Sequence, residues 1–174
     1  NPNNLKSVRF NEHMDAKGTV IWNFFPDQCR HCLTPVCKDV ADMSVPGAII
    51  KDPKTGAVLT TEKSAQLSEE DAQAVIDACP YNIPRRDPKT GMLAKCDMCI
   101  DRVSAGMQPI CVKTCPTGTM VFGEREEILP LAQKRLEEAR KRFPKAFLAD
   151  FTEVSVIYLL AEEKEHYYEY AAFM

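Results

Sequence analysis

The segment Cys29-Arg30-His31-Cys32-Leu33-Thr34-Pro35-Val36-Cys37 brings three cysteines together in a short stretch of chain. Five more cysteines follow, and all eight fall into two groups by spacing. The first group is Cys29, Cys32, Cys37 and Cys79, and the second is Cys96, Cys99, Cys111 and Cys115. Each group opens with a Cys-x-x-Cys pair, and its last cysteine directly precedes a proline, Pro80 or Pro116. This cysteine pattern indicates the fold class that the chain is expected to adopt.

Eight cysteines permit three interpretations: a disulfide framework, two zinc sites with four cysteines each, or iron–sulfur clusters. The chain has 174 residues, which is long for a disulfide scaffold, and Cys-x-x-Cys pairs suit a metal better. Zinc ribbons also use such pairs, but they need neither a proline after the last ligand nor long, unequal gaps between ligands. A cysteine followed by proline is how bacterial iron–sulfur motifs end, so iron–sulfur clusters are favoured.

The first group keeps only part of a bacterial ferredoxin motif, which reads Cys-x2-Cys-x2-Cys-x3-Cys-Pro. Counted backwards from Cys79, the three earlier ligand positions are occupied by Glu69, Ala72 and Val75. Counted forwards from Cys37, the fourth position is occupied by Ala41. The group therefore contains two incomplete motifs, one with three ligands and one with only its closing ligand.

In paired ferredoxin modules, each cluster takes its closing cysteine from the other motif. Under that rule one complete cluster is held by Cys29, Cys32, Cys37 and Cys79. The four substituted positions would then have been the ligands of a single second cluster that was lost as a whole. Loss of ligands one at a time would have damaged both clusters. A helix expected at Ser68–Ala78, with Ser68 as its N-cap, would fill the vacated space and bury Ala72, Val75 and Ile76.

The second group is an intact motif with an insertion between Cys99 and Cys111. Two arrangements are open: the four cysteines hold one self-contained cluster, or Cys96, Cys99 and Cys111 hold a cluster while Cys115 serves another one upstream. We expect the second arrangement. The chain opens abruptly at Asn1-Pro2-Asn3-Asn4, which suggests that a segment with four more cysteines precedes it.

The rest of the sequence predicts an α+β fold of ferredoxin-like iron–sulfur modules with short hairpins and helices. A repeated Asp-Pro-Lys-Thr-Gly turn, at 52–56 and 87–91, predicts two hairpins. The expected pairs are Ala48–Lys51 with Ala57–Thr60, and Ile83–Arg86 with Met92–Lys95. We place the iron–sulfur domain at residues 1–123, and a C-terminal helix, strand and tail at residues 124–174.

In the C-terminal part, Glu126–Arg142 predicts an amphipathic helix, with Pro130 tolerated in about its first turn. Val154–Leu160 predicts a strand. The aromatic tail at Glu165–Met174 either packs on its own domain or contacts a partner, since aromatic residues are enriched at interfaces.

Composition excludes several classes of function. The net charge is −3 with no basic block, so nucleic acid is not an expected partner. The longest apolar stretch, Val156–Ala161, is too short to span a bilayer. The sequence offers no nucleophile, acid–base pair or nucleotide loop, so the chain is not expected to be an enzyme by itself.

Four segments closely resemble the iron–sulfur (beta) subunits of formate dehydrogenases. They are FFPDQCRHC at Phe24–Cys32, ACPY at Ala78–Tyr81, AKCDMCIDR at Ala94–Arg102 and CVKTCPTGTMVFG at Cys111–Gly123. The chain is most similar to the three-cluster version in soluble molybdenum or tungsten formate dehydrogenases, but the N-terminal cysteine motif of that family is missing here.

This resemblance implies an electron-transfer subunit. A separate catalytic subunit would carry molybdenum or tungsten on pterin cofactors and interconvert formate and carbon dioxide. This chain would hold two or more [4Fe–4S] clusters, three in the complete subunit, and pass electrons to an external carrier such as a cytochrome. The complex would be periplasmic, with this subunit exported alongside its partner, or alternatively cytoplasmic.

Other functions stay open at this point. The chain could serve another molybdopterin oxidoreductase or a hydrogenase, or be a zinc-stabilised interaction module. The roles of the residues beside the ligands also stay open. His31 is expected to support the site or lie at the surface and not to be a ligand. The basic side chains either raise a cluster potential or are ordinary solvated charges; they are Arg30, Arg85, Lys95 and Arg102.

Overall fold

The structure is a computed structural model that describes residue 2 and residues 4–173. Its fold is α+β, as the sequence predicts. In the described part of the chain the strands pair as four antiparallel two-stranded ribbons. The strands are β1 (Lys6–Met14), β2 (Val20–Gln28), β3 (Ile49–Lys51), β4 (Val58–Thr60), β5 (Arg85–Arg86), β6 (Leu93–Ala94), β7 (Phe147–Ala149) and β8 (Tyr158–Leu160). The helices are α1 (Val36–Ser44), α2 (Glu69–Asp77), α3 (Ile100–Ser104), α4 (Ile110–Lys113) and α5 (Arg125–Arg140), with short 3₁₀ turns η1 (Glu62–Gln66) and η2 (Lys164–His166).

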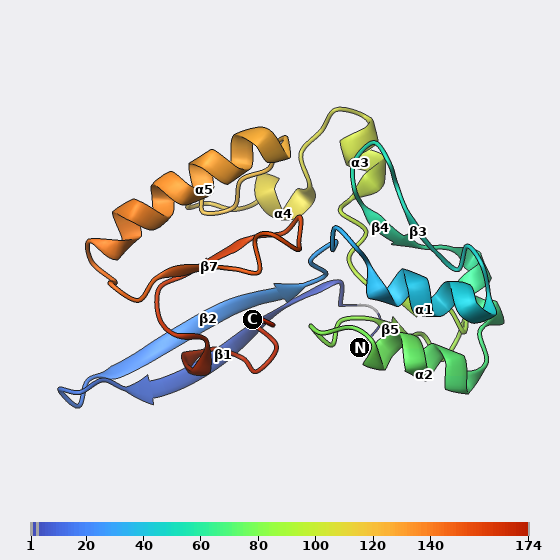
Figure 1. Cartoon of the computed structure of the whole chain (residues 1–174), viewed down its shortest axis with the longest axis horizontal. Coiled ribbons are helices and arrows are strands. Elements are labelled where there is room, and N and C mark those ends of the chain that lie inside the picture. The colour runs from blue at the N-terminus through green and yellow to red at the C-terminus, as the bar shows by residue number, and fades with distance from the viewer. Residues whose placement is uncertain (1, 3, 174) are drawn as a thin grey trace.

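These elements gather around two hydrophobic cores. In Figure 1, α1, α2, β3 and β4 form one end of the molecule, and the long β1–β2 hairpin with β7 and α5 forms the other. The first core is Ala41, Ala48, Ile49, Val58, Leu67, Ala72, Val75 and Leu93. The second core is Phe25, Ala149, Leu160, Ala171 and Ala172. The segment from Cys29 to Val36 joins the two ends, so the first cysteines lie where the cores meet.

The long N-terminal hairpin was not foreseen from the sequence. Its strands pair in register from Lys6 opposite Gln28 to Met14 opposite Val20. The Asp15 carboxylate shapes the turn by accepting the N–H groups of Lys17 and Thr19, both at 2.8 Å. Alternating apolar residues in both strands were the available signal, because a period of two is typical of strands.

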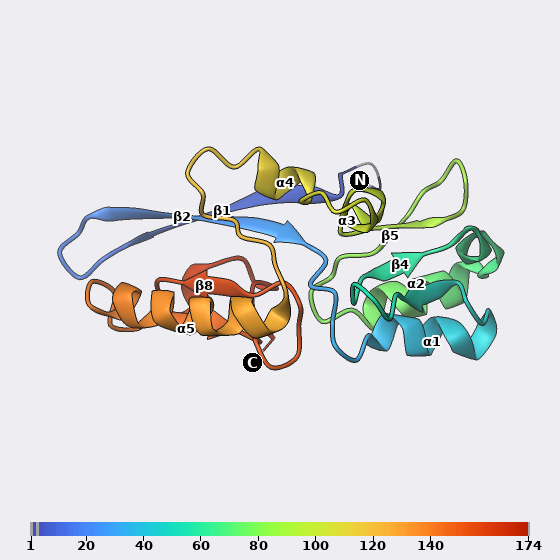
Figure 2. The same cartoon turned by 90° about the horizontal axis from the view of Figure 1, so that it is seen from above.

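One face of this hairpin is covered and the other is not. Figure 2 shows α5 and β8 on one side of the hairpin. The uncovered face carries large apolar side chains that are each more than half exposed: Val8, Phe10, Met14, Val20, Trp22 and Phe24. Phe10 packs edge-on against Trp22 and tilted against Phe24. Contiguous exposed apolar patches are a typical feature of interaction surfaces.

Both short hairpins and the central helix are confirmed. Strand β3 pairs with β4, and β5 with β6, although the ladders are shorter than expected. Helix α2 begins after Ser68, whose hydroxyl accepts the Asp71 N–H at 3.0 Å, and it ends before Ala78. Because this cap satisfies a backbone donor that the helix leaves unpaired, the helix starts where the sequence indicates.

The positions expected to have lost a cluster lie together. Ala41, Ala72 and Val75 are all buried, at 0–1 % exposed, in the first core. Ile76 is only partly buried against that core. Glu69 differs, because its side chain is 92 % exposed. Packed side chains from α1 and α2 therefore occupy the space that would lie between three of these four positions.

The C-terminal part differs in detail from expectation. Helix α5 begins at Arg125 and ends at Arg140, so Pro130 lies in its second turn and not its first. Proline there costs only one helical hydrogen bond near the start of the helix. The strand expected from Val154 is restricted to Tyr158–Leu160, and Val154 instead forms an isolated antiparallel bridge with Cys32.

The tail packs on its own chain for most of its length. Tyr167 contacts the second core, and Ala171 and Ala172 are part of it, whereas Phe173 is 66 % exposed. Met174 lies outside the described residues, and a partner contact of this tail stays a prediction. The boundary expected after residue 123 also stays a prediction, although Phe25 shares a core with Ala149 from the C-terminal part.

Replacing Val75 by alanine should lower the free energy of unfolding by about 2 kcal/mol, because two buried methyl groups are lost and α2 cannot collapse fully onto the gap. Anaerobic urea unfolding would measure this. As a control on the exposed face of the same helix, Gln73→Ala should change the value by about 0.5 kcal/mol or less. Equal effects of the two substitutions would contradict the assignment of Val75 to the core.

Candidate iron–sulfur site

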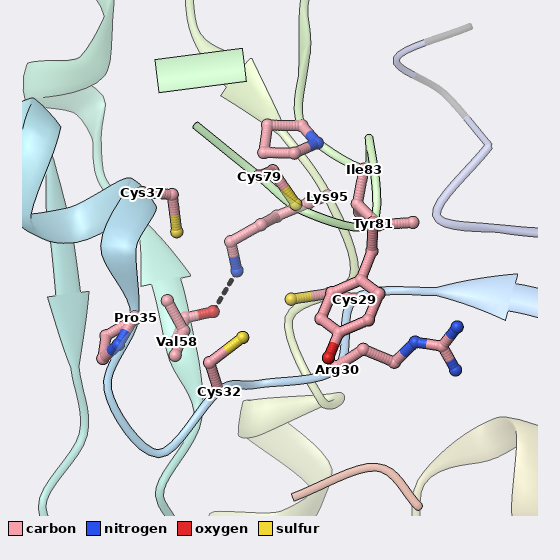
Figure 3. Close-up of a pocket in the computed structure, with 11 residues that line it drawn as sticks. Cys29, Arg30, Cys32, Pro35, Cys37, Val58, Cys79, Tyr81, Ile83 and Lys95 are labelled. Carbon is pink, nitrogen blue, oxygen red and sulfur yellow. Dashed lines mark hydrogen bonds between the residues drawn. The ribbon is translucent and has the colours of Figure 1, made fainter. Parts of the chain in front are cut away.

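The four cysteines of the first group line a single pocket (Figure 3). Cys29 follows β2, Cys37 lies in the first turn of α1, and Cys79 follows α2. Cys32 is held by its bridge to Val154. The pocket contains about 300 Å³ of space free of protein atoms, part of it continuous with solvent. Its remaining lining is mostly apolar, with two basic residues, Arg30 and Lys95. The other lining residues are Pro35, Val58, Tyr81, Ile83 and Pro84.

The two Cys-x-x-Cys turns share one backbone feature, although Cys99 is also left-handed and Cys32 is not. The third residue of each, His31 and Met98, is left-handed, with φ of 48° and 60°. In this conformation the His31 N–H donates to Cys29 Sγ at 3.4 Å, and the Met98 N–H donates to Cys96 Sγ at 3.5 Å. Amide donors aimed at sulfur favour a negatively charged thiolate, which is the form that binds metal.

The two Cys-Pro turns are also alike. The residue three positions after each closing cysteine is left-handed, with φ of 50° at Asn82 and 64° at Gly118. Asn82 donates its N–H to the Cys79 carbonyl at 2.9 Å. Burial raises the pKa of the Cys79 thiol, while backbone donors from Ile83 and Tyr81 oppose that rise. The proline thus opens a turn that directs amide groups at the closing sulfur.

The electrostatics of the first group require a cation. Burial, followed by the neighbouring Cys29, raises the pKa of Cys32 to about 11 and that of Cys37 to about 12. Thiols in this environment stay protonated at neutral pH unless a metal replaces the proton. One buried and three half-buried thiols around a mostly apolar pocket match the all-cysteine ligand set of a [4Fe–4S] cluster. The residues present therefore fit the cofactor that the sequence implies.

His31 is fully buried, so the surface position considered for it is wrong. Its Nδ1 accepts the Val58 N–H at 3.0 Å, which leaves the ring proton on Nε2. Burial, followed by the charge of Lys95, lowers the pKa of His31 to about 3. This histidine therefore stays neutral and fastens β4 to the Cys-x-x-Cys loop.

Arg30 is 2 % exposed and is not a solvated charge. Its guanidinium lies over the rings of Tyr158, Phe25 and Tyr81, at 4.1, 4.8 and 4.9 Å from their centres. Its Nη2 also donates to the Ala171 carbonyl at 2.9 Å. Cation–π contacts offset part of the cost of burying this charge. The side chain thereby ties the tail to the first cysteine pair.

The other basic side chains differ in burial. Lys95 is 6 % exposed and lines the pocket, so it is not a solvated charge either. Arg85 and Arg102 are half-buried and bind backbone carbonyls, of Pro84 and Gln108 respectively.

Sequence reasoning missed the part that the C-terminal segment plays in this site. The Arg30 carbonyl accepts the N–H groups of Ser155 and Val156, and Leu33 donates its N–H to Glu153 at 2.8 Å. The Tyr81 hydroxyl donates to Asp150 at 3.0 Å. The Ala-Cys-Pro-Tyr segment points to this tyrosine, but nothing in the sequence indicates its distant partner.

The second group of cysteines begins directly after Lys95 and ends just past α4. Burial raises the pKa of Cys96 to about 11. Cys115 is different. The Thr117 hydroxyl and the backbone donors of its turn lower the pKa of Cys115 to about 7. Cys96 and Cys115 therefore differ in burial and in hydrogen bonding.

Comparison with known proteins agrees with this chemistry. Residues 20–125 match the family model described as a 4Fe-4S dicluster domain. The chain is 78 % identical over 174 residues to formate dehydrogenase 2 subunit beta (cytochrome c-553) of Nitratidesulfovibrio vulgaris, covering all of this chain and 80 % of that protein. It is 48 % identical over 166 residues to formate dehydrogenase subunit beta of Megalodesulfovibrio gigas, covering 95 % and 76 %. The nitrate-inducible formate dehydrogenase iron-sulfur subunit of Escherichia coli is 36 % identical over 135 residues, covering 78 % and 43 %.

The fold, the eight cysteines and the family match define an iron–sulfur protein of the 4Fe-4S dicluster class. Within that class, the chain belongs to the family of formate dehydrogenase beta subunits, the iron–sulfur subunits of these oxidoreductases. It is an electron-transfer subunit with several [4Fe–4S] clusters, which sets aside the disulfide and zinc alternatives. None of the helices in the described residues combines the length and apolar character that crossing a membrane requires.

Acid should destabilise the protein through His31. Because its pKa is about 3 in the folded chain and 6.5 in the unfolded chain, the unfolded state binds more protons as the pH falls below 6.5. Between pH 7 and pH 5 this costs about 2 kcal/mol of unfolding free energy. Anaerobic urea unfolding at both pH values would measure the loss.

The matched variant is His31→Asn. Asparagine tolerates positive φ, and its carbonyl can accept the Val58 N–H in place of Nδ1, but it does not titrate. This variant should lose less stability on acidification than the wild-type protein, by the same amount of about 2 kcal/mol. If both proteins respond to pH alike, His31 does not carry the effect.

Proposed function

We propose that Cys29, Cys32, Cys37 and Cys79 hold one [4Fe–4S] cluster. The observation that carries this proposal is that the four cysteines line one pocket. Cys79 follows α2, whereas the other three come before β3 in the sequence. A cluster of this type needs four thiolates at the corners of one cavity, and this pocket supplies four thiols.

The second cluster takes Cys96, Cys99 and Cys111, and Cys115 serves a cluster upstream of this chain. The paired-motif rule supports this division, because each motif of a ferredoxin pair supplies its closing cysteine to the other cluster. The alternative, in which Cys115 completes the second cluster, is tested below.

Electrons from formate enter from a catalytic subunit that carries molybdenum or tungsten on pterin cofactors. Two observations support a stable partner: the relatives are named as subunits, and the β1–β2 hairpin presents an apolar face. Permanent complexes have interfaces that resemble a hydrophobic core, and aromatic residues such as Phe10, Trp22 and Phe24 are enriched there.

The electrons leave to an external carrier such as a cytochrome. The printed name of the Nitratidesulfovibrio vulgaris relative includes cytochrome c-553, which supports a carrier of this type. We place the complex in the periplasm, where a folded subunit can arrive together with a partner that bears the export signal. Fractionation of cells, with immunodetection of this subunit, tests the location, and a cytoplasmic signal alone would contradict it.

Replacing Cys79 by alanine should remove or convert one cluster and leave the other cluster signals in place, because Cys79 supplies the fourth ligand of the first pocket. Electron paramagnetic resonance (EPR) of the dithionite-reduced protein would follow each cluster separately. Cys99→Ala is the matched control, and it should affect a different signal. The assignment fails if both substitutions perturb the same cluster and leave the rest intact.

Iron analysis tests the three-cluster arrangement. A complete subunit should bind about twelve irons, as expected for three [4Fe–4S] clusters. In that protein Cys115→Ala should perturb a cluster other than the one lost in Cys99→Ala. About eight irons, with Cys99→Ala and Cys115→Ala affecting the same signal, would show instead that the second group holds one self-contained cluster.

A further inference from the structure

Lys95 is a buried cation inside the first cysteine pocket. It follows β6 directly, and its side chain reaches back between the sulfur atoms (Figure 3). The Nζ atom donates to the carbonyl of Val58 and, at 3.3 Å, to the carbonyl of Cys96. Only 6 % of the residue is exposed, so water screens its charge poorly.

Among the described residues, no carboxylate lies within ion-pairing distance of Lys95. A buried ammonium is costly unless an anion compensates it. Besides Tyr81, whose phenol pKa is raised by burial, the groups in the pocket that can become anionic are the four cysteines. The lysine and the metal-bound thiolates therefore offset each other's burial.

We propose that Lys95 is the countercharge of the cluster held by Cys29, Cys32, Cys37 and Cys79, and that it raises the reduction potential of this cluster. The proposal rests on the ligand assignment made above. Reduction adds one electron to the cluster, and no bond forms or breaks. Because that electron increases the negative charge beside the ammonium, Lys95 stabilises the reduced state more than the oxidised state.

Other nearby cations are less suited to this role. The Arg30 guanidinium points away from the sulfur atoms in Figure 3 and is enclosed by aromatic rings. Lys51 binds the carbonyls of Cys32 and Leu33 from a partly exposed position. Lys38 adjoins Cys37, but it pairs with Asp42 at 2.5 Å and its side chain is 33 % exposed. Lys95 alone among these combines burial, absence of an acidic partner and a position inside the pocket.

The experiment is an EPR-monitored redox titration of the intact complex with its catalytic subunit. The cluster of interest is the one whose EPR signal is removed by Cys79→Ala. Lys95→Gln keeps an amide donor near the Val58 carbonyl and removes the charge, and Lys95→Met keeps the apolar stem. Both should weaken reduction of that cluster at least tenfold in equilibrium constant, which lowers its potential by about 59 mV for one electron. Lys95→Arg should stay within threefold of wild type.

Lys38→Gln is the control, since it removes a charge next to Cys37 in the sequence that is partly exposed and paired with Asp42. It should leave the potential of the same cluster unchanged. If the neutral Lys95 variants assemble no cluster there while Lys95→Arg does, a cation is required in the pocket, as proposed. Loss of the cluster in all three Lys95 variants would mean that the shape of lysine matters and not its charge, which overturns the proposal.

A neutral variant that assembles every cluster with no change in any potential also overturns the proposal. Failure of the underlying assignment looks different. In that case Cys79→Ala leaves all cluster signals of an otherwise wild-type protein intact, whatever the Lys95 variants do.

Discussion

The structure depends on the meeting of four thiols that come from separate elements. Cys29 follows a strand, Cys37 lies in the first turn of a helix and Cys79 follows another helix, so the pocket forms only when these elements come together. Without metal, Cys32 and Cys37 resist ionisation, because burial raises the pKa of both thiols. Metal binding and folding are coupled in such a site, since a cation must replace the protons as the pocket closes. The left-handed residue His31 aims its N–H at Cys29 Sγ in this pocket, and Met98 does the same for Cys96 Sγ in the second group.

Three ionisable residues beside the ligands have three different environments. Arg30 is enclosed by aromatic rings, His31 is a neutral hydrogen-bond acceptor for β4, and Lys95 enters the pocket itself. Tertiary contacts therefore determine the surroundings of each of these side chains, and its distance from a cysteine along the chain does not. Hydrogen bonds and charge near the sulfur atoms are what a protein can use to tune a cluster. The arrangement places one cation close to the first cluster and holds another away from it.

Three of the four positions where ferredoxin spacing predicts ligands of a second cluster belong to the hydrophobic core. They are Ala41, Ala72 and Val75, and all three pack in one apolar cluster. A protein interior is close-packed, because a void forfeits contacts on every side. On the opposite side of the pocket, the C-terminal segment binds the Cys29–Cys32 loop through backbone hydrogen bonds and the tail covers Arg30. The remaining cluster site is thus enclosed from two directions.

Local signals in the sequence determined the cysteine grouping, both turn-linked hairpins and helix α2 with its Ser68 cap. Spacing and capping act over a few residues, so they can be read without knowing the fold. The same spacing identified the vacated positions, because they are defined only by their distance from Cys37 and Cys79. The sequence alone also indicated the family, through its four cysteine-bearing segments. Tertiary structure decided the burial of His31 and Lys95, the cage around Arg30 and the replacement of the expected strand at Val154 by a bridge to Cys32. These features depend on residues that are far apart in the chain, and an amino-acid pattern carries no information about which distant surface will cover it.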